Sequence, residues 1–189
     1  MNLSPKLILL GDTHGFIKDF EKQEEVIKKY NPEFILSEML EDNILDSDAK
    51  FIEILEKKDI SNMTSVSEIE NLIKLCMEKK INLIGMDFKD FGFDKNLQEK
   101  IKNQSELNEE EQKEIETLLD KRERKNVETI KEYLGKTAKP IIVITGSWHL
   151  REDSPLRTSF KGYKMIYPSN SKGELVLEPT DEKISWGEK

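Results

Sequence analysis

The 189-residue chain has one cysteine, two histidines and no long apolar run. Its single thiol, Cys76, has no second thiol to pair with, so an internal disulfide is excluded and a reducing compartment fits. Cys76 stands at helical spacing among apolar residues, and we interpret it as a small buried hydrophobe. No segment approaches the roughly 20 apolar residues of a membrane helix. The apolar run near the start is too short for a secretory signal, so we expect a cytoplasmic protein that does not span a membrane.

Basic residues are in the minority, with 30 Lys and Arg against 38 Asp and Glu and a net charge of −8. A negative field of this kind disfavours nucleic acids and anionic membranes as partners. Charged and hydrophobic residues each make up 36% of the chain, which indicates a polar surface around a modest core. The length fits one domain.

Short apolar runs alternate with amphipathic stretches along the chain. The apolar runs predict buried strands, and they cover residues 7–10, 34–36, 81–86 and 140–145. Apolar residues at helical spacing predict helices over residues 16–30, 49–57, 66–80 and 107–134. Two later segments, 163–167 and 174–177, alternate with a period of two around the turn-rich stretch 168–173, which predicts an antiparallel hairpin.

This order predicts an α/β fold with a predominantly parallel sheet flanked by helices. A C-terminal antiparallel hairpin follows, and a helical excursion over 88–139 separates the third and fourth strands. We expect one domain over 1–179 and a polar, frayed tail over 180–189. The charge-rich helix of the excursion is expected to be a solvated surface, with a lid over the sheet edge as the alternative.

An ionisable side chain follows each of the four predicted parallel strands: His14, Glu38, Asp87 and His149. Both histidines stand three residues after a glycine that closes a strand. Since ligands of open α/β sheets bind beyond the carboxyl ends of the strands, we expect these groups to share one site.

Imidazole and carboxylate groups bind divalent metals and move protons near neutral pH. The sequence therefore predicts either a Zn, Mn or Fe site held by His14, Glu38 and His149 or a metal-free acid–base pair. Asp87 would orient a histidine or complete the ligand set. Taken singly, each residue also has a structural interpretation, for example His149 as a packed imidazole beside Trp148.

Paired Gly-x-x-His motifs, Gly11-Asp12-Thr13-His14 and Gly146-Ser147-Trp148-His149, with the strand-end Glu38 between them, resemble the erythromycin esterase/ChaN/TIKI/TraB superfamily. The resemblance covers most of the chain and includes the Arg-rich segment 122–126.

The resemblance implies a hydrolase-like site whose water is activated by a metal or by a histidine. It does not carry a substrate class over to this chain, for which we expect a small-molecule or peptide substrate. A helix arginine accompanies the site in that superfamily. Here it would be Arg124 or Arg122, because Lys125 separates Arg124 from Asn126. ChaN-like members are associated with haem, so a non-catalytic haem-binding protein is the alternative, and the aromatics Phe88, Phe91, Phe93 and Trp148 would lie near the mouth of its site.

The segment Leu9-Leu10-Gly11-Asp12-Thr13-His14-Gly15 also resembles the start of a calcineurin-type metallophosphoesterase. That family needs further metal-binding motifs, including a Gly-Asn-His, and the chain has only one other histidine. A dinuclear site would therefore lack ligands, and this interpretation ranks last. The substrate and the oligomeric state are left open by the sequence.

Overall fold

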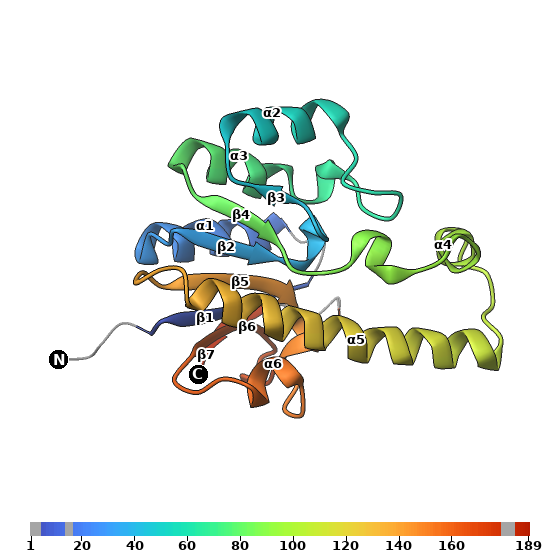
Figure 1. The fold of residues 1–189 in the computed structure, drawn as a ribbon. Helices are drawn as coiled ribbons and strands as arrows, with labels where there is room; N and C mark the ends of the chain where they lie inside the picture. Colours follow the sequence, from blue (N-terminus) through green and yellow to red (C-terminus); the bar gives the residue numbers. More distant parts are fainter. Residues whose placement is uncertain (1–4, 14–16, 179–183) are drawn as a thin grey trace.

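The computed structural model describes residues 5–13, 17–178 and 184–189, and it shows a sheet between two layers of helices (Figure 1). The strands lie in the order β3-β4-β2-β5-β1-β6-β7. They are β1 (Leu7–Asp12), β2 (Phe34–Ser37), β3 (Ile44–Leu45), β4 (Asn82–Gly85), β5 (Ile141–Gly146), β6 (Lys164–Ser169) and β7 (Ser185–Glu188). The α-helices are α1 (Ile17–Tyr30), α2 (Asp48–Lys57), α3 (Glu70–Lys79), α4 (Lys95–Lys102), α5 (Glu109–Leu134) and α6 (Pro155–Thr158).

The five inner strands, β4, β2, β5, β1 and β6, all run in the same direction. The short β3 and the C-terminal β7 pair antiparallel at the two edges. In register, Asp12 lies opposite Gly146, and Ser37 lies opposite both Ile144 and Gly85. The predicted α/β class is confirmed, and the carboxyl ends of β1, β2, β4 and β5 meet at one edge.

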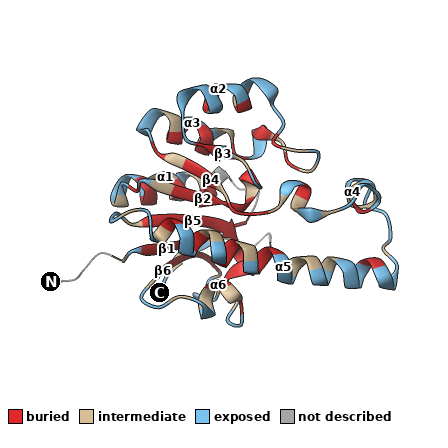
Figure 2. Ribbon diagram, viewed as in Figure 1, coloured by how far each residue is buried: buried red, intermediate tan, exposed pale blue. Residues whose placement is uncertain are grey.

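Both faces of the sheet are covered, which explains why its strands are continuous apolar runs (Figure 2). Ile8 and Leu10 point into the core under α1, α2 and α3, while Leu7 and Leu9 face α5 and α6. Cys76 is buried in the first of these cores, and burial raises the pKa of its thiol to about 12. This agrees with its interpretation as a small hydrophobe.

The C-terminal hairpin is present, but its second strand differs from the predicted one. β6 pairs with Ser185–Glu188, inside the segment expected to fray, and Leu175 forms a single bridge to Ser169. Residues 174–177 alternate as a strand does, yet the sheet edge beside β6 is taken by β7. Periodicity predicts a strand but does not select its partner.

The excursion between β4 and β5 forms α4 and the long helix α5. With 26 residues, α5 is about 39 Å long at 1.5 Å per residue. Its C-terminal half packs on the sheet through Val127, Ile130 and Tyr133, while its N-terminal half runs past the sheet beside α4 (Figure 1). Within the part of the chain that the structure describes, no helix is both long and apolar enough to cross a membrane.

β4 ends where the chain that follows β2 passes very close to it. The N–H of Gly85 donates to the carbonyl of Asn43 (2.7 Å), and the N–H of Asp87 donates to the carbonyl of Glu41 (2.9 Å). A Cβ at position 85 would lie 2.2 Å from the Glu41 carbonyl oxygen, which is backbone and cannot rotate away. Glycine is therefore required here by close approach.

We predict that Gly85→Ala destabilises the fold by about 1–3 kcal/mol, because the added methyl group forces two backbone segments apart. Urea unfolding measures the change. Gly135→Ala is the matched control, since Gly135 has right-handed helical angles and 3.3 Å to the nearest atom around an added Cβ. Equal stability of Gly85→Ala and the wild type would contradict the close approach of the Glu41 carbonyl to Gly85.

Candidate active or ligand-binding site

The shared strand edge brings several of the predicted site residues together. Glu38 begins a 3-10 turn directly after β2, and His149 lies in the 3-10 turn Ser147–Leu150 directly after β5. Asp87 follows β4 by two residues. The fourth predicted residue, His14, lies outside the described residues, so its place in the site stays a prediction from the sequence.

Glu38 is held rigidly at this edge. Its Oε2 accepts a hydrogen bond from the Thr145 hydroxyl (2.8 Å), and its Oε1 accepts one from the Gly146 backbone N–H (2.6 Å). Glu38 is 3% exposed. A buried carboxylate needs such donors, and here they come from the end of the neighbouring strand β5.

The imidazole of His149 lies between two carboxylates. Its Nε2 is 3.3 Å from Oε2 of Glu38, and its Nδ1 is 3.0 Å from Oε1 of Glu123 on α5. An imidazolium donates from both ring nitrogens, whereas a neutral imidazole donates from only one. The Glu38–His149–Glu123 chain therefore fixes the orientation of the ring and gives it partners that accept protons.

Glu123 was not among the residues predicted from the sequence. It is 1% exposed, and Arg151 binds both of its oxygens at 2.6 and 3.0 Å. Burial raises the pKa of Glu123, but hydrogen bonds from His149 and Arg151 outweigh burial and hold the pKa below its ordinary value. Glu123 therefore lies where it orients the His149 imidazole, while the role predicted for Asp87, to orient a histidine or complete a ligand set, stays a prediction.

Asp87 pairs with an arginine of α5. Nε of Arg122 donates to both Asp87 carboxylate oxygens (3.0 and 2.8 Å), and Nη2 lies 2.6 Å from Oδ2. Lys125 donates to the Asp87 backbone carbonyl, and Phe91 lies under the Arg122 guanidinium at 4.6 Å. Arg124, the arginine named first from the sequence, is exposed, so the alternative Arg122 occupies the site.

Four of these residues, Glu38, Phe91, Arg122 and His149, line a cavity of about 350 Å³. Its walls are charged, thioether and aromatic side chains: Glu38, Met39, Met63, Thr64, Glu68, Phe91, Arg122 and His149. Trp148 is 36% exposed beside His149, with the Arg151 guanidinium 3.6 Å over its ring. Of the predicted aromatics, Phe91 lines the cavity. Within residues 5–13, 17–178 and 184–189, no three His, Cys, Asp or Glu side chains gather closely enough to hold a metal ion.

Arg122→Ala is expected to destabilise the protein by about 3–5 kcal/mol, because it leaves the buried Asp87 carboxylate without its charged partner. Arg124→Ala, two residues away on the exposed side of the same helix, should change stability by no more than about 0.5 kcal/mol. Chemical denaturation of the two variants measures both effects. Similar losses in the two variants would contradict the assignment of Arg122 to the site.

Comparisons with known proteins bear on the fold. No family model and no curated protein matches the chain. Among solved structures, it is similar to ChaN of Campylobacter jejuni, described as showing cofacial haem binding, with 19% sequence identity and a TM-score of 0.52. The match covers 98% of this chain and 88% of that one. The chain therefore has the α/β fold of ChaN.

Proposed function

We propose that the chain is a ligand-binding protein whose ligand lies against His149 at the carboxyl edge of the sheet, and that haem is the ligand to test first. The observation that carries the proposal is the cavity itself, in which imidazole, thioether, guanidinium and aromatic groups face one space. Pockets of this size are typical of small-molecule sites, and polar side chains held in place by their partners, such as Glu38 and His149, give a ligand fixed positions to bind.

The donor set matches the chemical needs of haem. Imidazole and thioether groups bind haem iron, and His149 with the half-buried Met39 and Met63 would be the residues that hold it. Haem propionates pair with guanidinium groups, and Arg122 lies in the same wall. Phe91 would pack its aromatic ring against the macrocycle. Bound haem would bring its iron chemistry to this edge, and these side chains would hold and orient it.

The structural similarity to ChaN of Campylobacter jejuni supports haem over other flat ligands. That protein is described as binding haem, and its fold is shared along nearly the whole chain. The local geometry adds a condition. Because Nε2 of His149 faces Glu38 at 3.3 Å, a ligand bound at Nε2 must displace that contact, whereas a thioether ligand leaves it in place.

A second candidate is hydrolysis, and the Glu38–His149–Glu123 chain favours it. A histidine whose Nδ1 contacts a carboxylate is oriented as a general base or as a metal ligand through Nε2. Nε2 of His149 and Oε2 of Glu38, 3.3 Å apart, are close enough to share one Zn, Mn or Fe ion with bonds of about 2.0–2.1 Å. The proposed third ligand is His14, and Arg122 would face negative charge that develops on a substrate.

We expect haem added to the purified protein to give a shifted Soret band and saturable binding. If His149 binds the iron, His149→Ala should weaken haem binding about tenfold or more. If a thioether binds it instead, Met63→Leu should have this effect. Met77→Leu is the matched control, because Met77 packs against the core under α3, away from this cavity. A spectrum of free haem with the wild type, or equal affinity in all variants, would contradict the proposal.

Elemental analysis separates the hydrolase candidate from the haem proposal. If the chain is a metal-dependent hydrolase, protein purified without chelators or an affinity-tag metal should contain a divalent metal. The His14→Ala, His149→Ala double variant should lose this metal and keep its fold. No metal under any loading condition removes the metal-dependent form of the hydrolase candidate and leaves the haem titration unaffected.

A further inference from the structure

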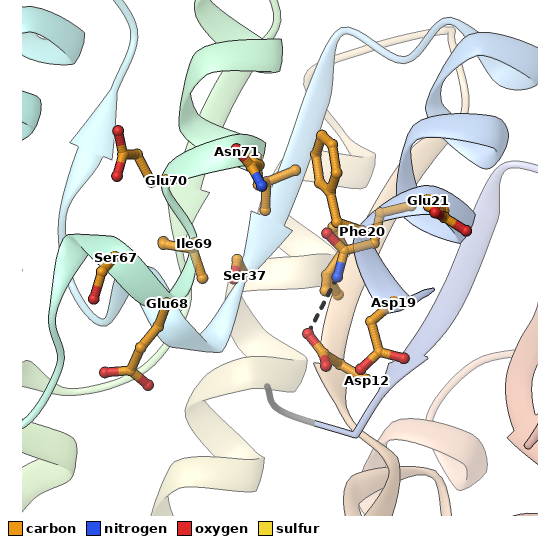
Figure 3. Close-up of a pocket in the computed structure, with 13 residues that line it drawn as sticks. Asp12, Asp19, Phe20, Glu21, Ser37, Ser67, Glu68, Ile69, Glu70 and Asn71 are labelled. Carbon is orange, nitrogen blue, oxygen red and sulfur yellow. Dashed lines mark hydrogen bonds between the residues drawn. The ribbon is translucent and has the colours of Figure 1, made fainter. Parts of the chain in front are cut away.

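A second cavity, of about 400 Å³, lies at the same strand edge on the face covered by α1 and α3 (Figure 3). Ile144 of β5 and Ser37 of β2 form part of its wall, between the starts of the two helices. Glu68 borders both this cavity and the one beside His149. Ser37 lines only the second cavity, and the next residue, Glu38, lines only the first.

The described residues that line the second cavity include no lysine, arginine or histidine. They include five carboxylates: Asp12, Asp19, Glu21, Glu68 and Glu70. Asp19 accepts from the Thr13 backbone N–H (2.9 Å) and hydroxyl (2.6 Å), and Glu68 accepts from the Ser65 backbone N–H (3.0 Å). The donors to Asp19 and Glu68 are neutral and leave the charges of these two carboxylates in place, whereas Glu70 forms an ion pair with Lys74 outside the cavity lining. The wall is negative and attracts a cation.

Ser37 is a second, independent sign of a ligand. Its side chain is 0% exposed, and its Oγ has no hydrogen-bond partner among the described residues. A buried hydroxyl without a partner is costly, and such groups in native structures call for an explanation. Figure 3 shows Ser37 in the wall of this cavity, across from Asp12, whose Oδ2 accepts from Gln23 (3.1 Å).

The rest of the wall combines the neutral polar residues Gln23, Ser67 and Asn71 with apolar side chains. Phe20, Ile69, Leu72 and Ile144 line it together with the carboxylates. The described carboxylates do not gather closely enough to hold a metal ion. An occupant with both an apolar body and a positive group fits this combination better than a bare ion does.

We propose that this cavity binds a small organic cation, an amine with an aromatic or aliphatic body. Its ammonium group donates to the Ser37 hydroxyl and to the surrounding carboxylates, and its body packs against Phe20 and Ile144. Among the described lining residues this site shares only Glu68 with the His149 cavity, and the proposal does not depend on what that cavity binds.

Isothermal titration calorimetry with tryptamine and with its uncharged analogue 3-ethylindole tests the charge requirement. The wild type should bind tryptamine at least about tenfold more tightly, and added salt should weaken tryptamine binding as surface charges are screened. Glu68→Gln keeps the capping hydrogen bond yet removes one negative charge, so it should weaken binding. The matched control Glu56→Gln, at an exposed position of α2 outside the cavity, should not.

Ser37→Ala tests the hydroxyl directly. We expect tryptamine affinity to fall about three- to tenfold, the effect of one hydrogen bond, while the midpoint of thermal unfolding stays the same or rises. His149→Ala should leave tryptamine affinity unchanged. The proposal is overturned by no binding at millimolar tryptamine, by equal affinity for 3-ethylindole, by full affinity in Ser37→Ala, by a lower unfolding midpoint in that variant, or by loss of tryptamine binding in His149→Ala.

Discussion

The structure depends on one constraint, the common direction of β4, β2, β5 and β1. Parallel pairing places the residues that follow these strands at one edge, although Glu38 and His149 are 111 positions apart in the chain. The strands are buried on both faces, so polar side chains collect only where the strands end. Both cavities lie at this edge for the same reason: Ser37, the last residue of β2, lines one of them, and the next residue, Glu38, lines the other.

Buried charges at such an edge destabilise the fold unless each has a partner. The buried carboxylates beside His149 each have one. Glu38 takes its donors from β5, Asp87 takes Arg122, and Glu123 takes Arg151 together with His149. Helix α5 supplies both Arg122 and Glu123, so the helix that covers one face of the sheet also completes its edge. A binding site built in this way is rigid before its ligand arrives, which lowers the cost of binding.

The sequence predicted four of the five inner strands, β1, β2, β4 and β5, because continuous apolar runs such as 141–144 have few alternatives in a protein of this size. β6 was expected only as a strand of the hairpin, and its parallel pairing with β1 was not predicted. The sequence missed β7, whose four residues include a serine and a glycine and gain their pairing only from β6. Glu38 and His149 were found because they follow strands. Glu123 was missed because α5 carries charged residues of both signs along its whole length, and a helix this charged does not show which of its charges face the sheet. A usable signal exists, since Glu123 stands three, four and seven positions before the buried Asn126, Val127 and Ile130.

The central claim is that a buried histidine is held between two carboxylates at the strand edge, and nitrogen-15 NMR of the imidazole ring tests it most directly. The chain has two histidines, so His149→Ala assigns the signals. The account predicts a slowly exchanging ring N–H at Nδ1 of His149 whose resonance moves or disappears in Glu123→Gln. A ring proton that exchanges freely with water, and a spectrum that Glu123→Gln leaves unchanged, would contradict it.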